Sequence, residues 1–149
     1  MALQQETPAV ETAATRPVTH RVAPEDGGLL KIVAGYYPDD QEIGYGAVIL
    51  ANPQIKNEDI IYPGQKLLLP KIDNHTMITL NDNQHYCLYK VYYSSTQVEQ
   101  TISKLKEHDI HFLVRETWLP GAGPIYRIFL GGYDDKGKLK EAMVMAEKN

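Results

Sequence analysis

Residues 59–70 read Asp59-Ile-Ile-Tyr-Pro-Gly-Gln-Lys-Leu-Leu-Leu-Pro70, and this stretch decides the fold of the first half of the chain. Its segment Tyr62-Pro63-Gly64-Gln65 predicts a tight turn, because proline presets φ at the second turn position and glycine accepts the positive φ that follows. A short apolar strand over residues 66–69 follows directly, and Pro70 stops it. The segment therefore predicts a turn that leads into the last strand of a small module.

The residues before this turn predict the rest of that module. Residues 19–22 are expected to form a strand, and residues 27–37 a helix, because apolar residues recur there at helical spacing. Asp26 is a candidate N-cap, since its carboxylate can accept N–H groups of the first turn. The strands near 19–22 and 66–69 are expected to pair antiparallel, because so small a core must be closed.

A second helix is expected near residues 42–51, with Asp39 or Asp40 as its cap. Gly44 and Gly46 should weaken it by about 1 kcal/mol each relative to alanine. Pro53 prevents the helix from continuing. The predicted order of the module, residues 18–72, is therefore βααβ.

This order, with its acidic-glycine break Glu25-Asp26-Gly27-Gly28 and the segment Ala51-Asn52-Pro53, resembles the lysin motif (LysM), although the usual Gly-Asp-Thr/Ser-Leu start is altered. The resemblance implies a module that binds N-acetylglucosamine-containing glycans in a shallow groove between two loops. The glycan-binding residues that it implies are Glu25, Asp26, Gly27, Gly28, Leu29, Gln54, Ile55, Lys56, Asn57, Asp59 and Ile60. In the simpler alternative, the two glycines serve only the turn and the helix start, and the isoleucines are core residues.

In the second module, residues 85–149, the pattern of apolar and polar residues differs from that of the first and predicts the order βαββα. Strands are expected over residues 86–93, 111–119 and 125–130, with a loop over 120–124. One amphipathic helix carries Val98, Ile102 and Leu105, with Ser95 or Thr96 as its cap, and a last helix carries Leu139 and Ala142. Alternation places Tyr126, Ile128 and Leu130 on one face of the third strand, and Arg127 and Phe129 on the other.

The segment Tyr126-Arg-Ile-Phe-Leu-Gly-Gly-Tyr133, followed by a helix, resembles the sporulation-related repeat (SPOR) domain. That family folds as βαββαβ and binds peptidoglycan stripped of its stem peptides. The resemblance implies a polar and aromatic platform on the sheet face without helices, made of Tyr89, Trp118, Arg127 and Phe129. The first strand lacks the Gln and Gly that are usual in the family. The fourth strand is not evident in the sequence, and either an outside segment or residues 77–80 can supply it.

The predicted fold class is therefore α+β: a LysM-like βααβ module followed by a ferredoxin- or RRM-like βαββα(β) module of the SPOR type. Residues 1–17 contain few large apolar side chains, so we expect a disordered linker there. Residues 73–84 are polar around a short apolar piece and are expected to connect the two modules.

Composition excludes several classes of function. The formal net charge is −4 and no segment is strongly basic, so we expect no nucleic-acid partner, although RNA-binding RRM domains share the βαββαβ shape. No run reaches the roughly 20 apolar residues of a membrane span. The N-terminus lacks the basic and apolar regions of a signal peptide. If the protein acts in the cell envelope, as the resemblances imply, we therefore expect the sequence to be part of a longer chain.

The sequence contains no recognisable catalytic constellation and implies no cofactor. His108 and His111 have a spacing that could serve a metal, but no cysteine or carboxylate cluster completes it. Cys87 is the single cysteine, and an inert buried thiol is the expectation. Asp39-Asp40 and Asp134-Asp135 are typical of capping or solvated turns.

The two resemblances imply non-catalytic binding of peptidoglycan or a chitin-like glycan, which would anchor or position a protein in the periplasm or envelope of a bacterium. Two weak sites on one chain would then strengthen each other through effective concentration. The alternative is a protein–protein scaffold in an envelope, secretion or division complex, in which the modules dock to protein partners.

Overall fold

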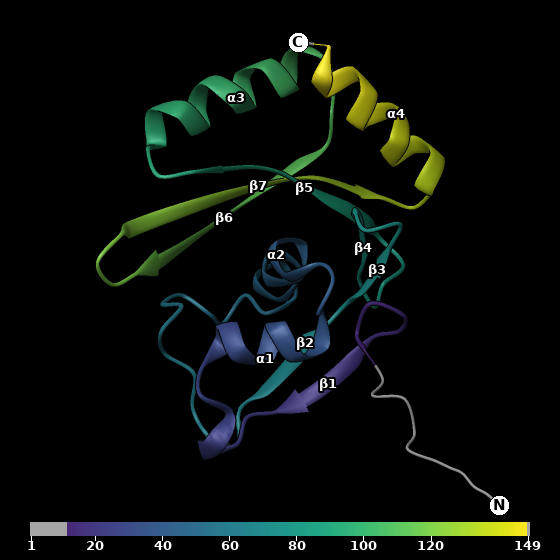
Figure 1. Ribbon diagram of the computed structural model, residues 1–149. Helices are drawn as coiled ribbons and strands as arrows, with labels where there is room; N and C mark the ends of the chain where they lie inside the picture. The colour runs from purple at the N-terminus through teal and green to yellow at the C-terminus, as the bar shows by residue number, and fades with distance from the viewer. Residues whose placement is uncertain (1–11, 149) are drawn as a thin grey trace, which may run out of the picture.

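The computed structural model describes residues 12–148 and has an α+β fold with two antiparallel sheets. The small sheet has the order β1-β2 and the large one the order β3-β4-β5-β7-β6. Figure 1 shows the layers: helices α3 and α4 cover one face of the large sheet, and the first module lies against the other face. The predicted α+β class is confirmed.

The first module follows its predicted order. Strand β1 (Val18–Arg21) pairs antiparallel with β2 (Lys66–Leu69), with Val18 opposite Leu69. Between them lie a short 3-10 helix η2 (Pro24–Asp26) and helices α1 (Leu29–Tyr36) and α2 (Gln41–Ala51). The turn before β2 is closed by a hydrogen bond from the Gln65 N–H to the Tyr62 carbonyl, at 3.0 Å. Gly64 takes the predicted positive φ, at 88°.

Asn52, which ends α2, joins this helix to β2 from a buried position. Its side-chain N–H groups donate to the carbonyls of Val48 at 2.7 Å and Leu68 at 2.8 Å, and its amide oxygen accepts from the Leu68 N–H at 2.9 Å. Because a buried amide needs such partners, this one side chain fixes the distance between helix and strand.

The predicted helix caps are wrong in detail. Gly28 occupies the N-cap position of α1, while the Asp26 carboxylate turns back and accepts from the Ala23 N–H at 2.7 Å. Asp40 holds the N-cap position of α2 but makes no side-chain cap bond, since its carboxylate contacts His75 at 2.8 Å. Ser94 rather than Ser95 or Thr96 precedes α3 (Ser95–Glu107), and it too makes no cap bond.

The expected linker is wrong where the structure describes it. Ala13 is fully buried in the first-module core, and its N–H donates to the Tyr36 carbonyl at 3.2 Å. Residues 12–14 therefore pack on the first module, whereas residues 15–17 are exposed. Residues 1–11 lie outside the described part of the chain, so their predicted disorder stays a prediction.

The expected connector is also wrong, because residues 71–79 form a β-hairpin of the large sheet. Strand β3 (Lys71–Asp73) pairs with β4 (Met77–Thr79), and β4 pairs antiparallel with β5 (His85–Tyr92). Of the two sources considered for a fourth strand, the structure therefore uses residues 77–79. An ion pair between Lys136 Nζ and Asp73 Oδ2, at 2.8 Å, ties the hairpin to the last helix.

The second module has its predicted element order. Strand β5 is followed by α3, then by β6 (Phe112–Leu119), β7 (Gly123–Tyr133) and α4 (Lys136–Glu147). Asp135 caps α4 by accepting from the Gly137 N–H at 2.6 Å. The predicted alternation along β7 is confirmed, because Ile128 and Leu130 pack in the core beneath the helices and Phe129 packs in the core on the opposite side.

The core on this side of the large sheet, opposite helices α3 and α4, is formed jointly by the first module and the sheet. It contains Val48 and Ile49 of α2 together with Ile78 of β4 and Phe129 of β7. Gly46 lets α2 approach closely, since a Cβ at this position would lie 3.3 Å from Leu88 of β5. Gly46, which was expected to weaken α2, therefore lies at the contact between this helix and the sheet.

Candidate functional site

A groove of about 670 Å³ lies between the first module and the large sheet. Its volume falls within the range of roughly 300–1,000 Å³ that is common for ligand pockets. The first module contributes Gly27, Gly28, Leu29, Leu30, Gln41, Glu42, Tyr45, Glu58 and Asp59. The second contributes Leu88, Val91, Tyr93, Leu119, Ile125 and Arg127. Two of the loops implied by the first resemblance therefore meet at this groove.

The backbone before α1 is open at Gly28, whereas the Lys31 side chain covers Gly27. Gly27 has a φ of 81° and Gly28 a φ of 115°, values that side chains disfavour. No heavy atom lies within 4 Å of the position that a Cβ would take at Gly28, so a ligand can approach the peptide backbone. Next to it, Leu30 is 63% exposed.

A buried ion pair forms part of the groove lining. The Arg127 guanidinium donates to Glu58 at 2.6 Å, and the Thr117 hydroxyl donates to the same carboxylate. Arg127 also lies over the ring of Tyr45, 5.1 Å from its centroid. Burial opposes the charge of Glu58, but the hydrogen bonds from Arg127 and Thr117 outweigh it and hold the pKa of Glu58 below its ordinary value. Burial raises the pKa of Tyr45, and Glu58 raises it further.

The loop that carries Glu58 is fixed to the second module by its backbone. The Trp118 N–H donates to the Lys56 carbonyl at 2.7 Å, and the Glu58 N–H donates to the Trp118 carbonyl at 2.9 Å. Asn57 forms the corresponding parallel bridge to Trp118. Arg115 of β6 donates to the carbonyls of Ile49 and Ile55. The two walls of the groove are therefore held at a set separation.

The structure brings only part of the expected LysM-like set together. Gly27, Gly28, Leu29 and Asp59 line the groove. Glu25 and Asp26 belong to η2 just before it, where the Asp26 carboxylate is engaged by the Ala23 N–H and His20; these contacts hold the pKa of Asp26 below its ordinary value.

The remaining members of that set lie outside the groove lining. Ile55 is 2% exposed and belongs to the core, as the simpler alternative expected. Lys56 and Asn57 are engaged with β6 through their backbones. Gln54 donates to the Asn52 side chain at 3.3 Å, and Ile60 is 46% exposed.

The expected platform on the large sheet does not exist as an open surface. Phe129 is fully buried and Arg127 is 8% exposed, because the first module covers this face. Tyr89 lies on the opposite face, where its hydroxyl donates to the Ala146 carbonyl at 3.2 Å. Trp118 is 52% exposed near the end of β6. These four side chains therefore do not form one site.

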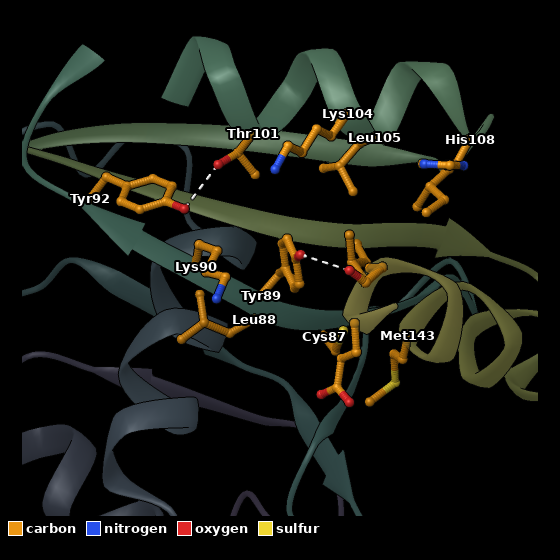
Figure 2. A pocket seen from close by; sticks show the side chains of 14 residues that line it. Cys87, Leu88, Tyr89, Lys90, Tyr92, Thr101, Lys104, Leu105, His108 and Met143 are labelled. Carbon is orange, nitrogen blue, oxygen red and sulfur yellow. Dashed lines mark hydrogen bonds between the residues drawn. The ribbon is translucent and has the colours of Figure 1, made fainter. Parts of the chain in front are cut away.

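Tyr89 lines a second cavity, of about 580 Å³, between the large sheet and helices α3 and α4. Figure 2 shows Thr101, Lys104 and Leu105 reaching into it from α3, with Tyr89 and Tyr92 on β5 across from them. Thr101 donates to the Tyr92 hydroxyl at 2.9 Å. Burial raises the pKa of the Cys87 thiol in its lining to about 11, so this thiol is protonated at neutral pH.

Several groove residues were missed by sequence reasoning, notably Tyr45, Glu58, Val91 and Tyr93. Glu58 lies inside a loop that the sequence singled out, but its partner Arg127 is 69 positions away, and nothing local indicates the pair. His108 lines the second cavity, while His111 stacks on Tyr133 with ring centroids 4.6 Å apart. Among residues 12–148, no three histidine, cysteine or acidic side chains are grouped to hold a metal ion.

Comparison with protein-family models, with curated proteins and with solved structures gave no significant match. None of the helices in the described part of the chain combines the length and the apolar character needed to cross a bilayer.

Proposed function

We propose that this protein binds an N-acetylglucosamine-containing glycan, such as peptidoglycan or a chitin-like polymer, without catalysing a reaction on it. The observation that carries the proposal is the meeting of two LysM-like loops, at Gly27–Leu29 and at Asp59, on one open groove. The backbone at Gly28, which no side chain covers, can be approached by acetamido and hydroxyl groups, and the apolar lining offers contact to sugar rings.

The LysM-like identity of the first module and the SPOR-like identity of the second are part of this proposal. Support comes from the βααβ order of the first module and from the βαββα order of the second, with β4 as the additional strand. The place of action would be the periplasm or envelope of a bacterium, where such a protein would anchor or position another one.

The direct experiment is co-sedimentation of the chain with purified peptidoglycan sacculi, in the presence and absence of chitin oligosaccharides as competitors. Pelleting that the oligosaccharides abolish is the expected result. Absence of pelleting, together with no heat of binding when N-acetylglucosamine hexamer is titrated into the protein, would refute the proposal.

A protein–protein scaffold is the second candidate, and one observation favours it. Helix α4 exposes an adjacent apolar pair, Val144 at 56% and Met145 at 45%. Such exposed apolar side chains suit a protein partner better than a glycan. If sacculi do not bind the chain, chemical cross-linking in envelope extracts, compared with a Val144→Ser variant, is the appropriate next measurement.

A further inference from the structure

The groove has a second wall, which comes from the second module. Val91 of β5 and Tyr93 directly after β5 lie on this side with Leu119 and Ile125. Tyr93 is 64% exposed and Val91 is 38% exposed. Folding therefore leaves an aromatic ring and an aliphatic side chain accessible across the groove from the glycine backbone of the first module.

Contacts within the chain hold this second wall against the first. The hydrogen bonds of Trp118 to Lys56 and Glu58 join the two modules beside the groove, and the Glu58–Arg127 ion pair joins them in its lining. A ligand that enters would not have to bring the two walls together. Such preorganisation lowers the entropic cost of binding.

The charges around the groove select among ligands. The positive charge of Arg127 is compensated by Glu58, whereas Glu42 and Asp59 add two exposed carboxylates to the lining. The lining is therefore net negative. Carboxylates accept hydrogen bonds from hydroxyl and acetamido groups but repel anions.

We infer that the two modules form one composite site, in which an uncharged N-acetylglucosamine oligomer lies between the Gly27–Gly28 backbone and the side chains of Val91 and Tyr93. One face of a sugar ring packs on Tyr93, and the polar groups of the sugar meet the opposite wall. This inference rests on the proposed function and replaces the expectation of two separate sites on one chain.

The test uses Tyr93→Ser and a matched control, Tyr62→Ser. Tyr62 is 65% exposed, close to the 64% of Tyr93, but it lies in the turn before β2 and outside the groove. Isothermal titration with N-acetylglucosamine hexamer should show about tenfold weaker binding for Tyr93→Ser, the loss that removal of one aromatic contact produces. The control should bind like the unchanged protein.

The possible outcomes separate this inference from the proposed function. If the unchanged protein binds the hexamer and Tyr93→Ser binds equally well, the second wall plays no part and the composite site is refuted, while glycan binding by the first module stands. If the unchanged protein does not bind the hexamer, the inference fails, and the proposed function fails with it when the chain also does not pellet with sacculi. Equal losses in both tyrosine variants would also refute a specific role for Tyr93.

The charge selection has its own measurement. Peptidoglycan strands stripped of their stem peptides carry a free muramic acid carboxylate on every second sugar, whereas the hexamer is neutral. The unchanged protein should bind stripped strands more weakly than the hexamer, and the difference should shrink at about 1 M salt, where the Debye length is roughly 3 Å. Glu42→Gln with Asp59→Asn should reduce the same difference at low salt. Tighter binding of stripped strands by the unchanged protein would refute the selection.

Discussion

At the scale of single residues, the pair Glu58–Arg127 is the most consequential contact between the two halves of the chain. The Glu58 side chain is 2% exposed and that of Arg127 is 10% exposed, and the two belong to different modules. Loss of one partner leaves a charge in a buried position, which costs about 3–5 kcal/mol. Replacement of both by apolar residues removes that cost.

Arg127→Met is therefore expected to lower the free energy of unfolding by about 3–5 kcal/mol, whereas the double variant Glu58→Leu, Arg127→Met should recover most of that loss. Urea denaturation of the unchanged protein, both single variants and the double variant measures the coupling. Additive losses in the double variant would show that the two side chains do not depend on each other.

The same carboxylate predicts a pH dependence of stability. The pKa of Glu58 lies below its ordinary value of 4.5 in the folded protein, so the ionised form stabilises the fold. This contribution is complete above pH 4.5 and is lost as the pH falls through the lower folded-state pKa. Unfolding free energy, measured in urea between about pH 6 and pH 2.5, should fall less steeply for Glu58→Gln than for the unchanged protein. Parallel curves would contradict this role.

At the scale of elements, β4 connects two cores although it is only three residues long. Met77 packs in the core beneath α3 and α4, and Ile78, its neighbour in sequence, packs in the core shared with the first module. The alternation of a strand places consecutive side chains on opposite faces, so this short strand serves both sides of the sheet.

Met77→Ala and Ile78→Ala should each destabilise the protein by about 2–5 kcal/mol, the usual range for truncation of a buried large side chain. Ile60→Ala, at a site 46% exposed, is the control and should change the unfolding free energy by no more than about 0.5 kcal/mol. Thermal or urea denaturation of the three variants and the unchanged protein measures these changes in unfolding free energy. Losses below 1 kcal/mol at both strand positions would mean that β4 is dispensable.

The elements also show where sequence reasoning succeeds. Turn chemistry at Pro63 and Gly64, and the apolar periodicity of the helices, predicted the helices and most of the strands, because these signals are local. The connector was misjudged because β3 and β4 are three residues each, too short for alternation to stand out from a loop. Helix caps failed because Asp26 and Asp40 found partners outside their helices.

The candidate site depended on contacts that local signals do not contain. Alternation along β7 indicated which side chains share a face, but not that α2 would cover Arg127 and Phe129. A signal was present: Ile125 and Phe129 on one face and Ile128 on the other make both faces of β7 apolar. Strands that are apolar on both faces are typical of sheets covered on both sides.

At the scale of the whole molecule, the shared core predicts that both modules unfold together. Cys87 can report on the second module, because it is the single cysteine of the chain and is buried beneath α4. Ile32→Ala changes only the first-module side, where Ile32 is 5% exposed. If the modules are coupled, a change in the first must alter the accessibility of the thiol in the second.

Ile32→Ala should therefore increase the rate of Cys87 labelling by a thiol reagent at least about tenfold, in urea well below the unfolding midpoint of both proteins but high enough for global opening to govern labelling. Leu30→Ala, at a site 63% exposed in the same helix, should leave the rate nearly unchanged. Unchanged labelling in Ile32→Ala, despite a lower midpoint for the first module, would show two independent units.

The β3–β4 hairpin also bears on how such a protein can be recombined. Its strands lie in sequence before β5 and directly after β2, yet they complete the sheet to which β5 belongs. A genetic exchange that joined a new N-terminal module at residue 84 would remove the β3–β4 edge of the sheet. An exchange at residue 70 would keep this edge but remove the first module, which covers Phe129 and pairs with Arg127. Each half is therefore expected to be inherited with the other, and fusion partners are best attached outside residues 12–148.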